Sequence, residues 1–237
     1  MRASTADIAS PKGPAQKSAP RTKEELAYEQ LKALILAGEL PKDEFLSQRK
    51  LAERVDTNLT TVRTALRQLE NDGLIENVPQ WGVRIPPETE ERLRDLYFMR
   101  ELLEVGAVRR LVQGKESVDI KTIREKAKRC DALARKLPES LVEYNEAHYD
   151  FHMELAKQSG SDLLVHSLNR IHFRSWLLRH DLRLWKRKDV VNHQRMVDVI
   201  FSSPERVAVE EIRDHILGGL EGELVELRKS LAKNAKE

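Results

Sequence analysis

The sequence contains a single cysteine, few aromatic residues and no long hydrophobic run. The one cysteine, Cys130, excludes an internal disulfide and fits a reducing compartment. No apolar run approaches the roughly 20 residues that a membrane-spanning helix needs. The N-terminus also lacks the apolar core of a secretory signal. We therefore expect a cytoplasmic protein with no membrane partner.

Aromatic residues make up only 5% of the chain, and runs of β-branched residues are scarce, which favours a mainly α-helical fold. Apolar residues account for 40% and charged residues for 34%, which is typical of globular chains with many exposed helix faces. The net charge of +2 is too small to indicate nucleic acid binding by itself. A chain of 237 residues can form one large core or two smaller ones.

Residues 51–69 contain two short helical patterns with a tight break between them. Each pattern has an apolar stripe, the first formed by Leu51, Ala52 and Val55 and the second by Val62, Ala65, Leu66 and Leu69. The intervening residues 56–60 have side chains that favour turns and helix N-caps. So short a gap predicts a helix-turn-helix. Its second helix begins with hydrogen-bonding side chains and Arg63, types that reach phosphates and base edges from the major groove.

The flanking segments predict a winged unit over residues 22–87. Residues 1–21 are rich in Ala, Ser, Pro and Lys and are expected to form a disordered tail, either inert or in weak contact with DNA phosphates. An amphipathic helix should follow Thr22 and end at Gly38. Strand-like runs at 74–78 and 82–85 predict a hairpin, the wing, and Pro86-Pro87 predicts a stiff linker.

Residues 88–237 show helical periodicity and no convincing strand. Proline, glycine and serine breaks divide them into six expected helices, over residues 90–111, 118–137, 140–158, 162–184, 189–201 and 205–232. Short turns between helices predict an antiparallel bundle. The expected fold class is therefore mainly α: an N-terminal winged helix-turn-helix followed by an antiparallel bundle of six to seven helices.

Four of the seven histidines occupy positions from which they can converge inside this bundle. His148 and His152 are four residues apart on one helix face, while His193 and His215 are expected near the middles of the fifth and sixth helices. Three helices could thus aim four imidazoles at one metal ion. Four buried structural histidines are the alternative. Three other histidines and two tryptophans of this region are interpreted as surface or packing residues: His166, His172, His180, Trp176 and Trp185. Either tryptophan could also line a cavity.

This layout resembles the GntR family of bacterial transcription regulators, in the FadR-like subfamily with an FCD ligand-binding domain. The resemblance covers nearly all of residues 24–232. In the N-terminal part it rests on residues 35–40, 51–53, 60–66 and 69–75, and on Gly82 with Val83. In the C-terminal part it rests on residues 96–100, Glu104, Phe151, His152, His193 and His215.

The resemblance implies a set of DNA-binding residues: Arg49, Asn58, Thr60, Thr61, Arg63 and Gly82. Gly82 would let the wing backbone approach the minor groove or the phosphates. Leu59 departs from the family pattern, because relatives commonly carry an arginine there, so no particular base sequence is carried over. A solvated helix face is the alternative for Arg49 and Arg63.

The resemblance also implies a divalent metal in the C-terminal domain. Many FCD domains use an aspartate or asparagine four residues before the first of three histidines. Here His148 takes that place, so the expected ligands are His148, His152, His193 and His215. Four imidazoles favour zinc or nickel over hard ions such as manganese. In the family such a site often receives the carboxylate of a small organic acid. Arg100 matches an arginine that could bind this carboxylate, and a salt bridge to Glu104 is the equal alternative.

The expected function is a ligand-responsive transcription regulator that binds a palindromic operator as a homodimer, with repression released by ligand as the common family behaviour. We expect no enzymatic activity. One alternative is a metal-dependent hydrolase or oxygenase with a DNA-binding appendage, using Glu101, Glu104 or Glu146 as acid or base. The other is a bundle that serves only for dimerisation and binds neither metal nor ligand.

Overall fold

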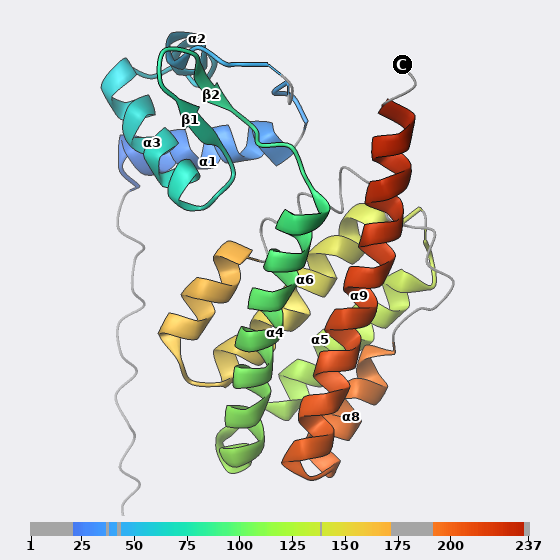
Figure 1. Ribbon diagram of the computed structural model, residues 1–237. Helices are drawn as coiled ribbons and strands as arrows, with labels where there is room; N and C mark the ends of the chain where they lie inside the picture. Colours follow the sequence, from blue (N-terminus) through green and yellow to red (C-terminus); the bar gives the residue numbers. More distant parts are fainter. Residues whose placement is uncertain (1–20, 37, 42–43, 138, 172–191, 235–237) are drawn as a thin grey trace, which may run out of the picture.

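The computed structural model describes residues 21–36, 38–41, 44–137, 139–171 and 192–234, which form a small N-terminal unit and a bundle of long helices (Figure 1). An extended segment containing Pro86 and Pro87 connects the two. Most of the predicted tail lies outside the described residues. So do the second half of the predicted fourth helix and the side chains of His172, Trp176, His180 and Trp185.

The N-terminal unit is a winged helix-turn-helix, as the sequence predicts. Its helices are α1 (Lys23–Leu36), α2 (Gln48–Arg54) and α3 (Leu59–Asn71), and its strands are β1 (Glu76–Val78) and β2 (Gly82–Arg84). Asn58 caps α3, because its side chain accepts a hydrogen bond from the Thr61 backbone N–H at 2.9 Å. The strands pair antiparallel with Asn77 opposite Val83. The two predicted apolar stripes meet in one core with Leu31, Ile35, Leu74 and Val83.

Gly82 occupies a position in the wing that other residues do not tolerate. Its φ is +107°, and a Cβ there would lie 2.5 Å from the Leu46 carbonyl oxygen. The contact is close because Leu46 and Val83 exchange backbone hydrogen bonds of 2.7 and 3.1 Å, which add a third segment to the wing. The structure therefore gives Gly82 a packing role that the sequence analysis did not consider.

Gly82→Ala is expected to lower the free energy of unfolding of the winged unit by about 2–3 kcal/mol, because the strained φ and the backbone clash add. Gly38→Ala is the matched control. Gly38 also has a positive φ, of +66°, but no atom lies within 4 Å of the added Cβ, so a loss of about 1 kcal/mol is expected. Urea unfolding of both variants measures the difference, and equal losses would contradict the packing role.

The C-terminal unit is an all-helical bundle. It comprises α4 (Glu90–Gln113), a short 3-10 turn at Lys115–Ser117, α5 (Ile120–Ala134), α6 (Leu141–Gln158), a helical stretch at residues 162–171, α8 (His193–Ser202) and α9 (Glu205–Asn234). The long helices α4 and α9 lie side by side and run in opposite directions (Figure 1). The core of the bundle includes Leu93, Tyr97, Val108, Phe151, Ile200, Ile212 and Ile216. None of the described helices combines the length and apolar character needed to span a membrane.

One expected helix position is corrected by the structure. His193 was predicted near the middle of its helix, but it is the first residue of α8, immediately after the N-cap Asn192. The Asn192 side chain accepts from the Arg195 backbone N–H at 2.9 Å, which fixes where α8 begins. His193 therefore enters the core from a helix terminus rather than from a helix face.

Candidate metal centre and candidate DNA-binding face

Four imidazoles from three helices converge in the centre of the bundle. They are His148 and His152 of α6, His193 of α8 and His215 of α9, and one potential ligand atom from each lies within 4.8 Å of all the others. The Nε2 atom of His152 lies 3.1 Å from that of His215 and 3.3 Å from that of His148. His152 and His193 are completely buried. The structure therefore brings together all four histidines that the sequence singled out.

These spacings fit ligands of one metal ion. Metal–nitrogen bonds of about 2.0–2.1 Å place neighbouring ligand nitrogens about 3.3 Å apart in a tetrahedron and about 2.9 Å apart in an octahedron. The two shortest separations, 3.1 and 3.3 Å, fall within that range. Imidazole nitrogens are common ligands of divalent first-row metals. The residues present therefore fit a divalent metal.

Glu104 of α4 holds His152 in the tautomer that a metal ligand needs. Its Oε2 contacts His152 Nδ1, and its Oε1 accepts from Arg100 Nε at 3.0 Å. Because a carboxylate only accepts, the ring N–H lies on Nδ1 and the lone pair of Nε2 faces the other histidines. Both Glu104 and Arg100 are buried. The salt bridge predicted as one alternative for Arg100 thus exists, and it lies next to the cluster of four histidines.

Arg100 retains hydrogen-bonding capacity after pairing with Glu104. Its Nη1 is buried and has no hydrogen-bond partner among the described residues. The guanidinium also lies over the Tyr97 ring, 4.8 Å from its centroid. A buried donor without a partner is costly in a folded protein. This nitrogen is therefore available to an acceptor from outside the described part of the chain.

Asp131 of α5 performs the same task for His193. Its Oδ1 accepts from both Nδ1 and the backbone N–H of His193 at 2.9 Å, and its Oδ2 accepts from the Gln194 backbone at 3.1 Å. Burial alone would raise the pKa of Asp131, but the hydrogen bonds from His193 and Gln194 outweigh it, and the net pKa is lowered. The carboxylate stays ionised and directs His193 Nε2 away from itself, where the Cys130 sulfur lies 3.7 Å from it.

His215 is held neutral by its surroundings. Burial lowers its pKa well below 6.5, and repulsion from His152 and His193 lowers it further. A neutral imidazole is the form that binds a metal ion. The site therefore combines a neutral histidine with two histidines whose tautomers are fixed by carboxylates.

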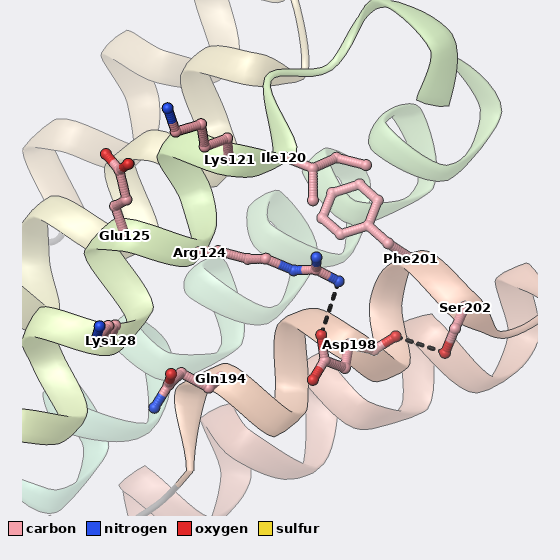
Figure 2. A pocket seen from close by; sticks show the side chains of 9 residues that line it. All are labelled: Ile120, Lys121, Arg124, Glu125, Lys128, Gln194, Asp198, Phe201 and Ser202. Carbon is pink, nitrogen blue, oxygen red and sulfur yellow. Dashed lines mark hydrogen bonds and ion pairs between the residues drawn. The ribbon is translucent and has the colours of Figure 1, made fainter.

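A separate surface groove of about 730 Å³ runs between α5 and α8 (Figure 2). Arg124 reaches towards Asp198 in it, with 2.9 Å between Nη2 and Oδ1. None of the four histidines lines the groove, but Gln194 does, and the Gln194 side chain also donates to Asp131 at 3.2 Å. The groove is thus a neighbour of the candidate metal centre and is separate from it.

The winged unit presents an exposed polar face around the start of α3. Arg49, Asn58, Thr60 and Arg63 are exposed there, and Arg63 Nε donates to Gln48 Oε1 at 3.0 Å. Thr61 differs from them, because it is buried and its hydroxyl donates to Glu24 at 3.3 Å. Its side chain lies inside the unit and would need a rearrangement of α1 to reach DNA.

Comparison with known proteins assigns this architecture. Residues 95–218, more than half of the chain, match the family described as "FCD domain". Residues 23–85 match the family described as "Bacterial regulatory proteins, gntR family". This chain belongs to the GntR family. It is a GntR transcription regulator with an FCD domain, as the sequence resemblance indicated.

Two relatives are similar over most of the chain. The HTH-type transcriptional repressor GlaR of Escherichia coli is 25% identical over 206 residues, which cover 80% of this chain and 90% of GlaR. The HTH-type transcriptional regulator LutR of Bacillus subtilis is 26% identical over 191 residues, which cover 73% of this chain and 84% of LutR. Both relatives are transcriptional regulators that align with this chain over most of their own length.

Two solved structures share the fold. A GntR regulator from Rhodococcus sp. RHA1 superposes with a TM-score of 0.66 at 19% identity, covering 85% of this chain and 97% of that one. Escherichia coli McbR/YncC superposes with a TM-score of 0.61 at 17% identity, covering 90% of this chain and all of that one. At these identities the likeness concerns the fold alone.

The structure adds three residues of this GntR regulator that the sequence analysis did not assign. Asp131 follows Cys130 on the otherwise apolar stripe of α5. An acidic residue in such a stripe is the sequence feature that could have identified it. Glu104 was considered only as a partner of Arg100 or as an acid or base. Trp81 is 67% exposed in the wing turn, with its ring centroid 5.4 Å from that of Phe45. An exposed aromatic residue in a wing is a further candidate for DNA contact.

Asp131→Asn is expected to weaken zinc or nickel binding about 10- to 100-fold, the usual effect of removing a carboxylate that orients a histidine ligand. Asp198→Asn is the matched control. Asp198 also forms a contact between α5 and α8, but its partner is the exposed Arg124 and not a histidine of the cluster. Competition against a chromophoric chelator measures both affinities. Equal affinities for the two variants would show that Asp131 does not orient a ligand.

Proposed function

We propose that this GntR regulator is a metal-dependent, ligand-responsive repressor that binds a palindromic operator as a homodimer. The observation that carries this proposal is the presence on one chain of an exposed polar recognition helix and four converging imidazoles beside a buried arginine. We place the DNA-binding unit at residues 22–87 and the effector and dimerisation unit at 88–237. Such a protein would act on the chromosome in the cytoplasm.

Operator contact is proposed for Arg49, Asn58, Thr60 and Arg63. With α3 in the major groove, the two arginines would reach phosphates or guanine edges, and Thr60 and Asn58 would hydrogen-bond to the backbone or bases. The Asn58 oxygen already caps α3, so its amide nitrogen is the atom left for DNA. Two copies related by a two-fold axis would read half-sites about 34 Å apart.

The effector site is proposed at the metal centre. His148, His152, His193 and His215 would hold zinc or nickel, which when bound supplies a positive charge and an open position for a carboxylate. Arg100 Nη1 offers an N–H to the same carboxylate, and the Glu104 bond to Nε holds the guanidinium in place. A small organic acid is therefore the class of ligand that this arrangement favours.

A polar contact joins the bundle to the recognition unit. Arg170, on the helical stretch at 162–171, pairs with Asp72 at the end of α3, with 3.0 Å between Nε and Oδ1, and it also donates to the Asn71 carbonyl. Tyr28 of α1 donates to the other Asp72 oxygen at 2.8 Å. The stretch at 162–171 packs on α6 through Leu168 and Met153. An effector that shifts α6 would thus change the placement of α3, provided that it binds the two arrangements unequally.

The enzyme alternative loses support from the positions of its candidate acids. Glu101 accepts from Arg213 at 2.8 Å, and Glu104 is shared between Arg100 and His152. Glu146 is exposed on the surface of α6. The pure dimerisation alternative leaves a buried cluster of four histidines, two acids and an arginine without purpose, although such clusters are costly to bury.

Arg63→Ala is expected to weaken binding of the purified protein to DNA from its own promoter region by at least about tenfold at moderate salt, because one good contact is worth 1–3 kcal/mol. Arg206→Ala, an exposed arginine at the start of α9, is the control and should bind like the wild type. Fluorescence anisotropy with labelled fragments measures both. If no upstream fragment is bound more tightly than random DNA, or if both variants bind equally, the proposal fails.

A further inference from the structure

The groove between α5 and α8 has an apolar end and a polar end (Figure 2). Ile120 lies next to the ring of Phe201 at the apolar end, and Lys128 and Gln194 line the other end. Lys128 precedes Asp131 by about one helical turn, and Asp131 accepts a hydrogen bond from Gln194, which places both polar groups where α8 begins. The rise of α5 from Ile120 to Lys128 is about 12 Å. A ligand in this groove would thus meet an apolar wall and, one groove length away, a cation beside an amide.

The charges that line the groove favour an anion at its polar end. Arg124 and Asp198 pair with each other across the middle, so their charges offset one another. Figure 2 shows Glu125 pointing away from α8, on the same side as Lys121. Lys128 is exposed and forms no ion pair with any residue in the described part of the chain. The polar end therefore has a positive charge that is available to a ligand.

The ion pair across the middle does not close the groove to a flat ligand. The side chains of Arg124 and Asp198 are 58% and 63% exposed. Water screens a pair that is so exposed, so the pair contributes little to stability and opens easily. The Arg124 guanidinium can then lie over the face of an aromatic group, an arrangement that favours binding. The groove thus admits a flat body between Arg124 and the Phe201 ring.

We infer that this groove is a ligand site distinct from the four histidines, and that it takes an amphipathic monocarboxylate with a flat apolar body. The body packs along Phe201 and Ile120, and the carboxylate accepts from Lys128 Nζ and Gln194 Nε2. The volume of about 730 Å³ is in the range of small-molecule sites. An acid without an apolar body, such as acetate, leaves the apolar end in contact with water and is retained poorly.

Gln194 connects the groove to the histidine cluster. Its Nε2 donates to Asp131 Oδ2 at 3.2 Å, and Asp131 Oδ1 accepts from His193 Nδ1 at 2.9 Å. An amide nitrogen has two N–H groups, so Gln194 can donate to a bound carboxylate and keep its bond to Asp131. The added negative charge favours a cation on the nearby imidazoles. The groove ligand should therefore tighten zinc binding about fivefold, and zinc should tighten the groove ligand by the same factor. This coupling rests on the proposed metal site, whereas the groove site does not.

Isothermal titration of the metal-free full chain with biphenylcarboxylate tests the groove. The uncharged biphenylcarboxamide should bind at least about tenfold more weakly, because it lacks the charge-assisted hydrogen bonds. Lys128→Glu should weaken binding of the carboxylate at least about tenfold, because attraction becomes repulsion, and should leave the carboxamide nearly unchanged. Arg129→Glu is the matched control, since Arg129 is exposed on the same helix but does not line the groove. Circular dichroism should show that both variants fold like the wild type.

Competition of zinc against a chromophoric chelator, with and without saturating biphenylcarboxylate, tests the coupling. No binding of biphenylcarboxylate, or equal binding by the Lys128→Glu and Arg129→Glu variants, overturns the groove site and leaves the proposed function intact. Binding in the groove without a shift in zinc affinity overturns the coupling alone. A chain that binds no zinc overturns the proposed metal site, while the titration of metal-free protein still decides whether the groove binds the carboxylate.

Discussion

His152→Ala is expected to weaken zinc or nickel binding by more than about 100-fold, beyond the 10- to 100-fold loss that follows removal of an orienting carboxylate. His152 is the central ligand, since its Nε2 lies 3.1 Å from that of His215 and 3.3 Å from that of His148. Removal of its side chain therefore takes away one expected ligand and also the contact that links the histidine cluster to Glu104. Competition titration against a chromophoric chelator measures the metal affinity.

The control for this variant is His166→Ala. His166 is exposed on the helical stretch at 162–171 and is not a member of the convergent group. The His166→Ala variant should bind metal as tightly as the wild type does. Metal should also raise the thermal stability of the wild type and of the control, since a ligand at 100 times its dissociation constant adds about 2.7 kcal/mol. If His152→Ala binds metal as tightly as the control does, the four histidines are not its ligands.

Arg100→Met is expected to lower the free energy of unfolding of the bundle by about 3–5 kcal/mol, because it leaves the buried Glu104 without its cationic partner. The pair is almost fully excluded from solvent, with side-chain exposures of 1% and 3%. Methionine keeps most of the volume of arginine, so the loss reflects charge rather than a cavity. Urea unfolding of metal-free protein measures the change.

Arg228→Met provides the comparison for an exposed arginine with the same kind of partner. Arg228 donates to both oxygens of Glu90 at 2.7 and 2.6 Å, but the two side chains are 54% and 37% exposed. Solvent screens such a pair, so a much smaller loss is expected. The double variant R100M/E104Q should recover part of the loss of R100M, since it removes the uncompensated charge. Equal losses for R100M and Arg228→Met would contradict the expectation that burial makes the Arg100–Glu104 pair costly to break.

Local patterns in the sequence predicted the fold and half of the candidate site. The helix-turn-helix follows from two apolar stripes and the Asn58 cap, both of which act within a few residues. The pairing of His148 with His152 follows from the four-residue period of a helix. The convergence of His193 and His215 on them was inferred only as a possibility of the expected bundle, and the resemblance to a known family strengthened it, because nothing local relates helices so far apart in sequence.

The orienting carboxylates escaped prediction for the same physical reason. Glu104 lies 48 residues from His152, and Asp131 lies 62 residues from His193, so only the tertiary packing brings them together. Tertiary packing also decided that Thr61 turns inward to Glu24 while its neighbours Thr60 and Arg63 stay exposed. The fixed start of α8 at His193 depends on the Asn192 cap, which periodicity over residues 189–201 does not reveal.

X-ray absorption at the metal edge of the full chain, loaded with one equivalent of zinc or nickel, tests the central claim most directly. We predict a first shell of imidazole nitrogens at about 2.0–2.1 Å, with the multiple-scattering pattern of three to four histidines and no sulfur. A sulfur shell at about 2.3 Å would place the ion on Cys130 instead. A spectrum without imidazole scattering, or no binding at all, would contradict a metal centre at His148, His152, His193 and His215.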